Sequence, residues 1–306
     1  MAVISSLNDV FKNIQHVEKI DERLFRSFDP HMGGAFILTR VFGGQSVAQS
    51  YLVGRKLFPA HCINKLEITF LGPGQTNLPI DYYVEDFGSS NGILCLIAKQ
   101  KEKILFKCFL TYVSSPSSVL RAFNANMRYP EDVDPPNSYL SIETIVDMGP
   151  PDSEARERFK KVSKRLLFDL RPVDPGHFAG FSGELRPVIT WCRLATSLHG
   201  VDIPEPIFIV MLISDYLVFQ PAKILHDTFN RSEEYQTGSS LNHKIWIHHY
   251  DIDPYGFFLC VNDCELIDQS RPLLTGRIFD ERKRCIATFI QESFIQKQSS
   301  QEKAKL

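Results

Sequence analysis

The stretch Val41-Phe42-Gly43-Gly44-Gln45-Ser46-Val47-Ala48-Gln49-Ser50-Tyr51-Leu52-Val53 decides how the first part of this chain folds. Paired glycines let the backbone turn tightly, and the small residues that follow recur at helical spacing. We therefore predict a helix over about 44–57, whose Ala and Ser positions let a sheet pack closely against it. The alternating segment just before the glycines, about 35–42, predicts a strand.

The rest of the chain repeats one order of elements, a helix followed by four strands. In the first half the strands are predicted at about 62–71, 79–87, 92–100 and 103–113. In the second half a strand at about 188–196 precedes an apolar helix at about 206–222, and strands follow near 240–249, 256–267, 272–280 and 284–294. A curved antiparallel sheet wrapped around a long helix is the natural way to bury such a helix, so the repeat predicts an α+β protein.

The repeat and the breakers between its halves divide the chain of 306 residues into four parts. Residues 1–115 form the first unit and 166–296 the second. Residues 116–165 are rich in Ser and Pro and end in a charged stretch, so they predict a linker with a helix over about 152–165. Residues 297–306 form a polar tail.

Composition narrows the classes of function. The 43% of hydrophobic residues suffices for a sizeable core, and the net charge of -2 provides no basic footprint for nucleic acid or anionic membrane. The seven cysteines have an odd count and match no zinc spacing, which favours free thiols and predicts no metal. No N-terminal signal peptide is predicted, and the most apolar run, 206–219, is too short to span a bilayer.

A series of short motifs follows a fixed order along almost the whole chain. The motifs are Leu24-Phe25-Arg26, Val41 to Gln49, Phe70-Leu71 with Pro73-Gly74, Ser214-Asp215-Tyr216, His243 with Trp246 and His248, Gly276 to Asp280, and Ala287-Thr288 with Gln291-Glu292. In this order and at this spacing they resemble the type II acyl-CoA thioesterase family, the medium- and long-chain acyl-CoA thioesterases of bacteria and peroxisomes.

The resemblance implies a fold, a reaction and a site. The fold is a double hotdog, in which two antiparallel sheets each wrap around a central helix and form a pseudo-dimer. The reaction is hydrolysis of fatty acyl-CoA thioesters to free fatty acid and CoA, with no cofactor. The family's water-binding Asp, Thr or Ser, and Gln match Asp215, Ser240 and Gln291 here.

Further residues are candidates for substrate binding. The Gly43-Gly44-Gln45 turn opens the first helix, where backbone amides can stabilise an oxyanion, although glycines needed only for close packing explain it equally well. His243 lies among the family motifs, Arg271 matches a family arginine that can contact CoA phosphates, and Arg277 is another local candidate for that contact.

The residues themselves point the same way. Asp215 stands inside an apolar run, where an unpartnered carboxylate costs several kcal/mol. Gln291 shares a strand face with Ala287 and Phe289, and Ser240 opens a strand. Each has a structural alternative: an Asp bonded to backbone amides or an Arg, a satisfied edge amide, and a turn serine. Together the three suit a carboxylate base with a hydroxyl and an amide that hold a water.

The first unit departs from the family pattern, and this keeps a second function open. Asn64-Lys65-Leu66-Glu67 stands where members commonly have His-Ser-x-His, and Gly72 replaces an Arg. A catalytically weak or inactive acyl-CoA-binding hotdog protein is therefore the alternative. A hotdog hydratase is less favoured, because its Asp-His pairing near the first helix is not seen.

The last three residues, Ala304-Lys305-Leu306, form a variant of the Ser-Lys-Leu peroxisomal address. They predict a location in the peroxisome matrix and recognition of the tail by a peroxisomal import receptor. Exposed sheet edges of the predicted fold favour a homo-oligomer.

Overall fold

The structure, a computed structural model, describes residues 6–34, 37–85, 92–114, 127–150, 156–157, 166–229 and 237–296. The strands are β1 Glu18–Lys19, β2 Leu24–Ser27, β3 His61–Phe70, β4 Ile80–Glu85, β5 Ile93–Gln100, β6 Lys103–Ser114, β7 Phe168–Pro172, β8 Val188–Leu194, β9 Thr237–Ile247, β10 Phe258–Asp268, β11 Arg271–Asp280 and β12 Cys285–Gln296. The α-helices are α1 Leu7–Ile14, α2 Gly43–Leu57, α3 Ile142–Met148, α5 Pro175–Phe178, α6 Ile207–Ile213 and α7 Gln220–Phe229, with 3-10 turns η2 Pro136–Ser138 and η3 Thr196–Leu198.

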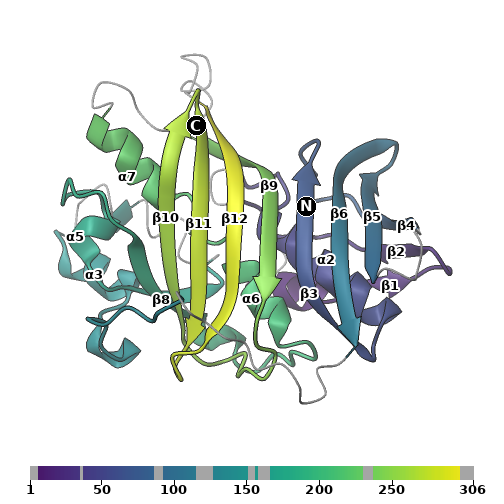
Figure 1. The fold of residues 1–306 in the computed structure, drawn as a ribbon, viewed down its shortest axis with the longest axis horizontal. Coiled ribbons are helices and arrows are strands. Elements are labelled where there is room, and N and C mark those ends of the chain that lie inside the picture. The colour runs from purple at the N-terminus through teal and green to yellow at the C-terminus, as the bar shows by residue number, and fades with distance from the viewer. Residues whose placement is uncertain are drawn as a thin grey trace.

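All of these strands belong to one 12-stranded sheet in the order β1-β2-β4-β5-β6-β3-β9-β12-β11-β10-β8-β7 (Figure 1). Each half of the sheet has the same internal order, because β2-β4-β5-β6-β3 corresponds to β8-β10-β11-β12-β9 read from the opposite edge. The predicted repeat of element order is therefore a structural repeat, and the strands missed by the prediction, β1, β2 and β7, lie at or next to the outer edges.

The two halves join through one pair of central strands, so that the two predicted sheets are continuous. Strand β3 pairs antiparallel with β9 from Lys65↔Trp246 to Thr69↔Asn242. At the middle of this ladder Lys244 Nζ lies 2.8 Å from a Glu67 carboxylate oxygen. Backbone pairing therefore fixes the position of one half relative to the other.

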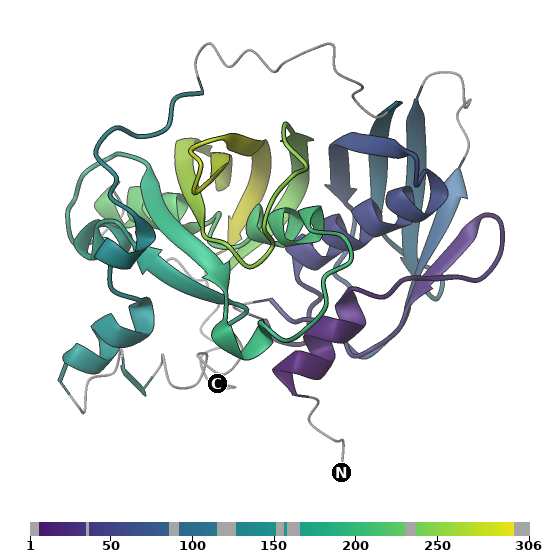
Figure 2. The same cartoon turned by 90° about the horizontal axis from the view of Figure 1, so that it is seen from below.

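Helices α2 and α6 lie side by side against one face of the sheet and form the centre of the core (Figure 2). The predicted helix over 44–57 is confirmed as α2, which is buried from Gly44 to Gly54. Its buried amides are paired: Gln49 donates to Ile14 O at 3.1 Å and accepts from the Tyr82 hydroxyl at 2.7 Å. Such pairing offsets the free energy that burial of polar groups otherwise costs.

Two element predictions were wrong, and one lies largely outside the described residues. The apolar helix expected over 206–222 is two helices, α6 and α7, separated by residues 214–219 with Leu217 at φ 70°. The described part of the strand expected over 35–42 is a turn that makes only isolated bridges, such as Arg40↔Gln75. The linker helix expected over 152–165 lies outside the described residues except for 156–157.

Gly276 offers a test of how tightly the second half is packed. A Cβ atom at Gly276 would lie 2.0 Å from the ring of Phe289, which is buried and stacks on His243. We expect Gly276→Ala to lower the free energy of unfolding by about 1–3 kcal/mol, the usual effect of overpacking a core. Urea denaturation measures the change. Gly200→Ala is the matched control, because a Cβ there meets nothing within 4 Å, and equal stability of both variants would contradict the prediction.

Candidate active site

Asp215 lies two residues after the end of α6, in the break between α6 and α7. Its side chain faces the protein interior, and only 7% of the residue is exposed. Burial raises the pKa of Asp215 to about 7, although the Gln291 amide, the Gly44 backbone N–H and the Ser240 hydroxyl each favour the ionised form and lower it. A carboxylate in this state is a base suited to neutral pH.

The N-terminus of α2 in the first half faces this carboxylate from the second half. A Cβ atom at Gly43 would lie 2.6 Å from Asp215 Oδ2, and one at Gly44 would lie 2.9 Å from Leu212 O. Both positions therefore require glycine for their close approach to the segment around Asp215. The amide N–H groups of a first helical turn lack intrahelical partners and carry partial positive charge, so this end of α2 favours negative charge.

Ser240 reaches the same place because of an irregularity in strand β9. Alternation from His243, which faces the core, would turn Ser240 toward the outer face of the sheet. However, the register of β9 against β12 shifts between Glu292↔Asn242 and Ser293↔Ser240. Such a bulge inserts one residue and re-aims the side chains beyond it. Ser240 Oγ consequently donates to Asp215 Oδ1 at 3.4 Å.

Gln291 completes the cluster from strand β12 and is fully buried. Its Nε2 donates to Ser240 Oγ at 2.6 Å and to Ser293 Oγ at 3.1 Å. The structure thus brings together Asp215, Ser240 and Gln291, the three residues singled out from the sequence. Sequence reasoning missed Ser293, although strand alternation already placed it on the same face as Gln291.

This cluster can bind and activate a water molecule. The carboxylate accepts a proton, and the hydroxyl and the amide are neutral donors and acceptors that can orient the water. The amides of the α2 N-terminus can stabilise an oxyanion that develops next to them. The set is therefore suited to general-base hydrolysis of an activated carbonyl compound.

A second pair near the site resembles a nucleophile with its base, but its burial argues against that role. Ser214 Oγ lies 3.1 Å from His243 Nε2, and both residues are almost completely buried. His243 Nδ1 lies 2.6 Å from Gln291 Oε1, so both ring nitrogens contact protein atoms. Burial also lowers the pKa of His243 to about 4. The structure therefore places His243 behind Gln291 and not in the direct substrate contact predicted from the sequence.

Two other predicted substrate-binding residues also have protein partners. The buried Gln45 accepts from the Met32 backbone N–H at 2.7 Å, and its Nε2 lies 2.8 Å from His31 Nδ1. It thereby holds the loop that leads into α2. Arg271 is exposed, and its Nη1 lies 3.0 Å from Glu292 Oε1 on the outer face of the sheet. A role for Arg271 in CoA binding stays a prediction.

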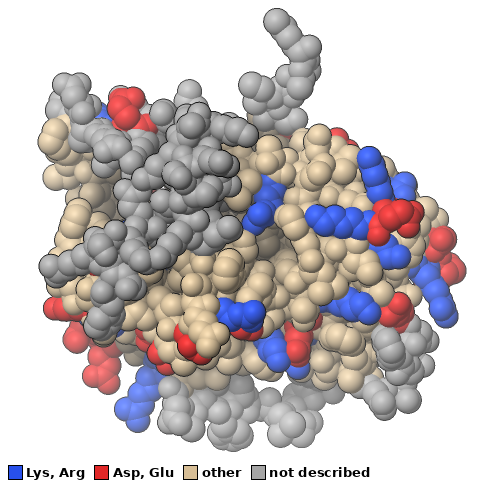
Figure 3. All heavy atoms as spheres, turned by 90° about the horizontal axis from the view of Figure 1, so that it is seen from above, with Lys and Arg blue, Asp and Glu red and all other residues tan. Residues whose placement is uncertain are grey.

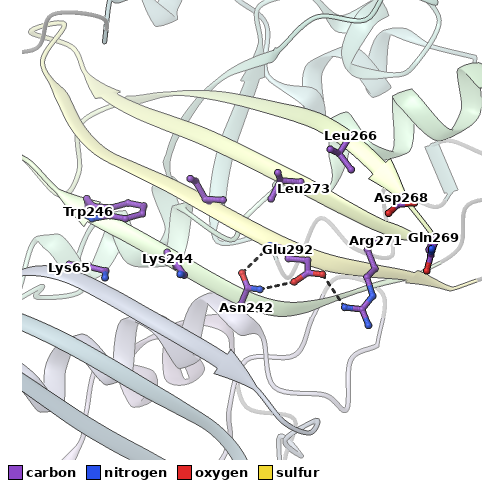
Figure 4. Close-up of a pocket in the computed structure, with 11 residues that line it drawn as sticks. Lys65, Asn242, Lys244, Trp246, Leu266, Asp268, Gln269, Arg271, Leu273 and Glu292 are labelled. Atoms are coloured by element: carbon purple, nitrogen blue, oxygen red, sulfur yellow. Dashed lines mark hydrogen bonds and ion pairs between the residues drawn. The ribbon is translucent and has the colours of Figure 1, made fainter. Parts of the chain in front are cut away.

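An open groove of about 590 Å³ lies on that outer face (Figure 4). Lys65, Lys244, Trp246, Arg271 and Glu292 contribute to its lining. Because side chains alternate along a strand, Asn242 and Glu292 point into this groove while His243 and Gln291 point to the core. The sheet itself therefore separates the groove from Asp215. Arg277 lines a neighbouring smaller hollow on the same outer face.

The surface shows mixed charge. On the described part of the face shown in Figure 3, Lys and Arg side chains are interspersed with Asp and Glu. Within the described ranges, no three His, Cys, Asp or Glu side chains come together as a metal site would require. Among the helices that the structure describes, none is both long and apolar enough to cross a membrane.

Comparison with known proteins gives one family and several related folds. Residues 129–295 match the family model described as the acyl-CoA thioesterase C-terminal domain. The human protein acyl-coenzyme A thioesterase 8 is 24% identical over 303 residues, which cover 96% of this chain and 91% of that protein.

Solved structures resemble the fold over most of the chain. The tesB protein of Mycobacterium avium subs. paratuberculosis superimposes with a TM-score of 0.70 at 17% identity and covers 95% of this chain and 100% of its own. The acyl-CoA thioesterase II TesB2 of Mycobacterium marinum gives 0.68 at 18%, with 94% and 98% coverage. A hot dog fold protein of Alicyclobacillus acidocaldarius gives 0.66 at 13%, with 94% and 98% coverage. The predicted double hotdog fold is confirmed.

The raised pKa of Asp215 predicts the sign of a stability change. Its pKa is about 7 in the folded state and near 3.8 in the unfolded chain, so the folded state binds the extra proton between these values. Stability is therefore lost as the pH rises through this window. Asp215→Asn removes the loss, and its stability relative to the wild type should increase by about 3 kcal/mol between about pH 5 and about pH 8.

Denaturant unfolding at both pH values measures this difference. Asp280→Asn is the matched control, because Asp280 is an equally buried carboxylate that pairs with Arg284 at 2.7 Å. Removal of this paired charge should lower stability at both pH values. A stability difference between Asp215→Asn and the wild type that does not change with pH would contradict the raised pKa.

Proposed function

The chain belongs to the acyl-CoA thioesterase family, and we propose that it hydrolyses fatty acyl-CoA with a water molecule held by Asp215, Ser240 and Gln291. One observation supports this assignment above all. A buried carboxylate with a pKa of about 7 lies beside a hydroxyl, an amide and a helix N-terminus, and none of these partners is cationic. Together these groups provide a base, two groups that orient a water, and an oxyanion site.

The reaction follows from these positions. Asp215 accepts a proton from the water as the water oxygen forms a bond to the thioester carbonyl carbon. The carbonyl oxygen becomes an oxyanion, which the partial positive charge at the α2 N-terminus stabilises. The tetrahedral intermediate collapses, the carbon–sulfur bond breaks, and the proton on Asp215 returns to the CoA sulfur. The products are a carboxylic acid and the CoA thiol, and Asp215 is again ionised.

Aromatic side chains around the cluster can accommodate an apolar acyl chain. The ring of Phe70 lies 3.6 Å from the Cβ position of Gly43. Phe42 packs edge-on against Tyr216, which follows Asp215 in the chain, with ring centroids 6.0 Å apart. These rings provide apolar surface beside the cluster, which supports a fatty acyl group as the substrate.

The proposed mechanism predicts which substitutions abolish turnover. Asp215→Asn should lower kcat by about 10²- to 10⁴-fold because the general base is lost. Ser240→Ala and Gln291→Leu should lower kcat by about tenfold or more, because each removes a group that orients the water.

In the wild type, kcat/KM should fall as the pH drops below about 7, where Asp215 is protonated. A panel of acyl-CoA chain lengths with detection of the released thiol provides the measurement.

The paired carboxylate of Asp280 again provides the control, and Asp280→Asn should leave kcat close to that of the wild type. Two outcomes would contradict the proposal. Activity that Asp215→Asn does not reduce would exclude the mechanism. Tight binding of acyl-CoA without turnover at any chain length would instead support the binding-protein alternative.

We also propose that the chain acts in the peroxisome matrix. The support is the tail Ala304-Lys305-Leu306, which lies outside the described residues. Self-association through the terminal strands β1 and β7 is a further proposal, because the outer edges of an open sheet carry unpaired backbone groups.

The targeting proposal predicts where a reporter goes. A fluorescent protein that ends in residues 295–306 should be punctate and coincide with a peroxisomal marker, because the import receptor reads a free C-terminal tripeptide. Deletion of Leu306 should make the signal diffuse. A diffuse signal for both fusions would argue against the proposal.

A further inference from the structure

A buried chain of hydrogen-bonding groups runs from the end of α6 to Asp215. Ser214 Oγ lies 3.1 Å from His243 Nε2, and His243 Nδ1 lies 2.6 Å from Gln291 Oε1. Gln291 Nε2 in turn lies 2.6 Å from Ser240 Oγ, which is 3.4 Å from Asp215 Oδ1. Every group before Asp215 can donate or accept, depending on its hydroxyl rotamer, ring tautomer or amide orientation, so this part of the chain can be polarised in either of two directions.

In the first direction, the Ser214 hydroxyl donates to His243 Nε2, and Nδ1–H donates to Gln291 Oε1. The Gln291 NH₂ group then donates to Ser240 and Ser293, and the Ser240 hydroxyl hydrogen is free to donate to Asp215. In the second direction, the Gln291 amide is reversed and its oxygen accepts from Ser240. The Ser240 hydroxyl then donates to Gln291 and no longer to Asp215, and the Gln291 carbonyl oxygen faces the Asp215 carboxylate.

The second direction keeps one hydrogen bond to a neutral carbonyl but loses one to the charged Asp215. It leaves the Ser214 hydroxyl donating to Met211 O, which lies 2.8 Å away. The first direction withdraws that donor from one backbone carbonyl. The second withdraws the Ser240 donor from a buried carboxylate and turns the Gln291 carbonyl oxygen toward it. Loss of a hydrogen bond to a charged group costs more than loss of one to a neutral group, so the first direction is favoured when Asp215 is ionised.

We propose that His243 is a positioning residue: by donating from Nδ1 to Gln291 Oε1, it holds the amide NH₂ of Gln291 toward Ser240 and Asp215. This inference rests on the proposed function, because it gives Gln291 its orientation in the water site. His243 itself touches no reacting atom. Its ring is fixed by stacking on Phe289, with centroids 5.6 Å apart and planes at 14°, and the Phe289 ring is packed against Gly276.

The tautomer of His243 tests the inference directly. In the full chain labelled with ¹⁵N at its histidines, NMR at about pH 8 should show His243 protonated at Nδ1 and unprotonated at Nε2. The His243 signals are those that disappear in His243→Asn. A proton on Nε2 with Nδ1 bare would overturn the proposal, because Gln291 would then have to donate to Nδ1 and turn its oxygen toward Asp215.

Kinetics test whether this contact serves catalysis. His243→Phe keeps the stacking on Phe289 but removes the donor, and kcat should fall by about 10- to 100-fold with KM changed less than about twofold. His243→Asn places an amide donor near the Nδ1 position and should restore kcat to within about threefold of the wild type. Equal losses in both variants would overturn the positioning role.

A double-mutant cycle separates positioning from a general loss of packing. If His243 acts through Gln291, His243→Phe should reduce kcat by less than about twofold when Gln291 is already Leu. A full multiplicative loss in that background would contradict the proposal. His177→Phe is the matched control, because His177 is also buried with both ring nitrogens bonded, at 2.7 Å to Ser182 Oγ and 3.0 Å to Arg186 O. His177 is part of α5, which lies away from α6 and β9 (Figure 1). This variant should lose stability but keep kcat.

Different results would overturn the proposed hydrolytic mechanism and the positioning role of His243. Activity that survives Asp215→Asn would overturn the proposed mechanism, while the NMR tautomer would still report the orientation of Gln291. Conversely, an active enzyme that needs Asp215 but carries His243 as the Nε2–H tautomer would keep the proposed function and overturn only the positioning role.

Discussion

A helix N-terminus from one half of the chain meets a carboxylate from the other half, at a distance that only glycine permits. A Cβ atom at Gly43 would be 2.6 Å from Asp215 Oδ2, so the approach of α2 to the end of α6 depends on its absence. Neither half can form this contact alone. The β3–β9 ladder and the packing of α2 against α6 hold the two halves in the relation that it requires. The fold thus sets the distance between the N-terminus of α2 and the Asp215 carboxylate.

The helix pair has two ends, and they are chemically different. At one end Asp215 has only neutral partners, with no cation among those that favour its charge. At the other end Glu205, just before α6, faces α2 and is paired with Arg55 at 3.2 Å, and the Tyr51 hydroxyl lies 3.4 Å from it. This carboxylate therefore has a cationic partner, which Asp215 lacks. The two halves therefore share a fold, but only the end of the helix pair at Asp215 has a buried carboxylate with neutral partners.

Much of this arrangement could be predicted from the sequence, for identifiable reasons. Two glycines before small residues at helical spacing predicted α2, and the repeated order of elements predicted two similar halves. Asp215, Ser240 and Gln291 were singled out because polar groups in apolar surroundings need partners and because the motifs resemble a family. Periodicity failed at residues 214–219, because apolar residues continue on both sides of Ser214-Asp215 and do not show where the helix ends. It also could not place Ser240, whose direction depends on a bulge in the backbone pairing of β9 and not on any residue type.

Asp215 can be both buried and basic because the groups that hydrogen-bond to it are neutral. A buried carboxylate without partners would be protonated at neutral pH, and one bonded to an arginine would be ionised but weakly basic. Hydroxyl, amide and backbone N–H donors stabilise the charge by less than a cation would, and they leave the pKa of Asp215 at about 7. The Ser240 hydroxyl can point its hydrogen at the carboxylate only when Gln291 donates to it. The orientation of Gln291 therefore matters as much as its presence, and a buried histidine behind it, which contributes no charge near neutral pH, is suited to set that orientation without disturbing the pKa.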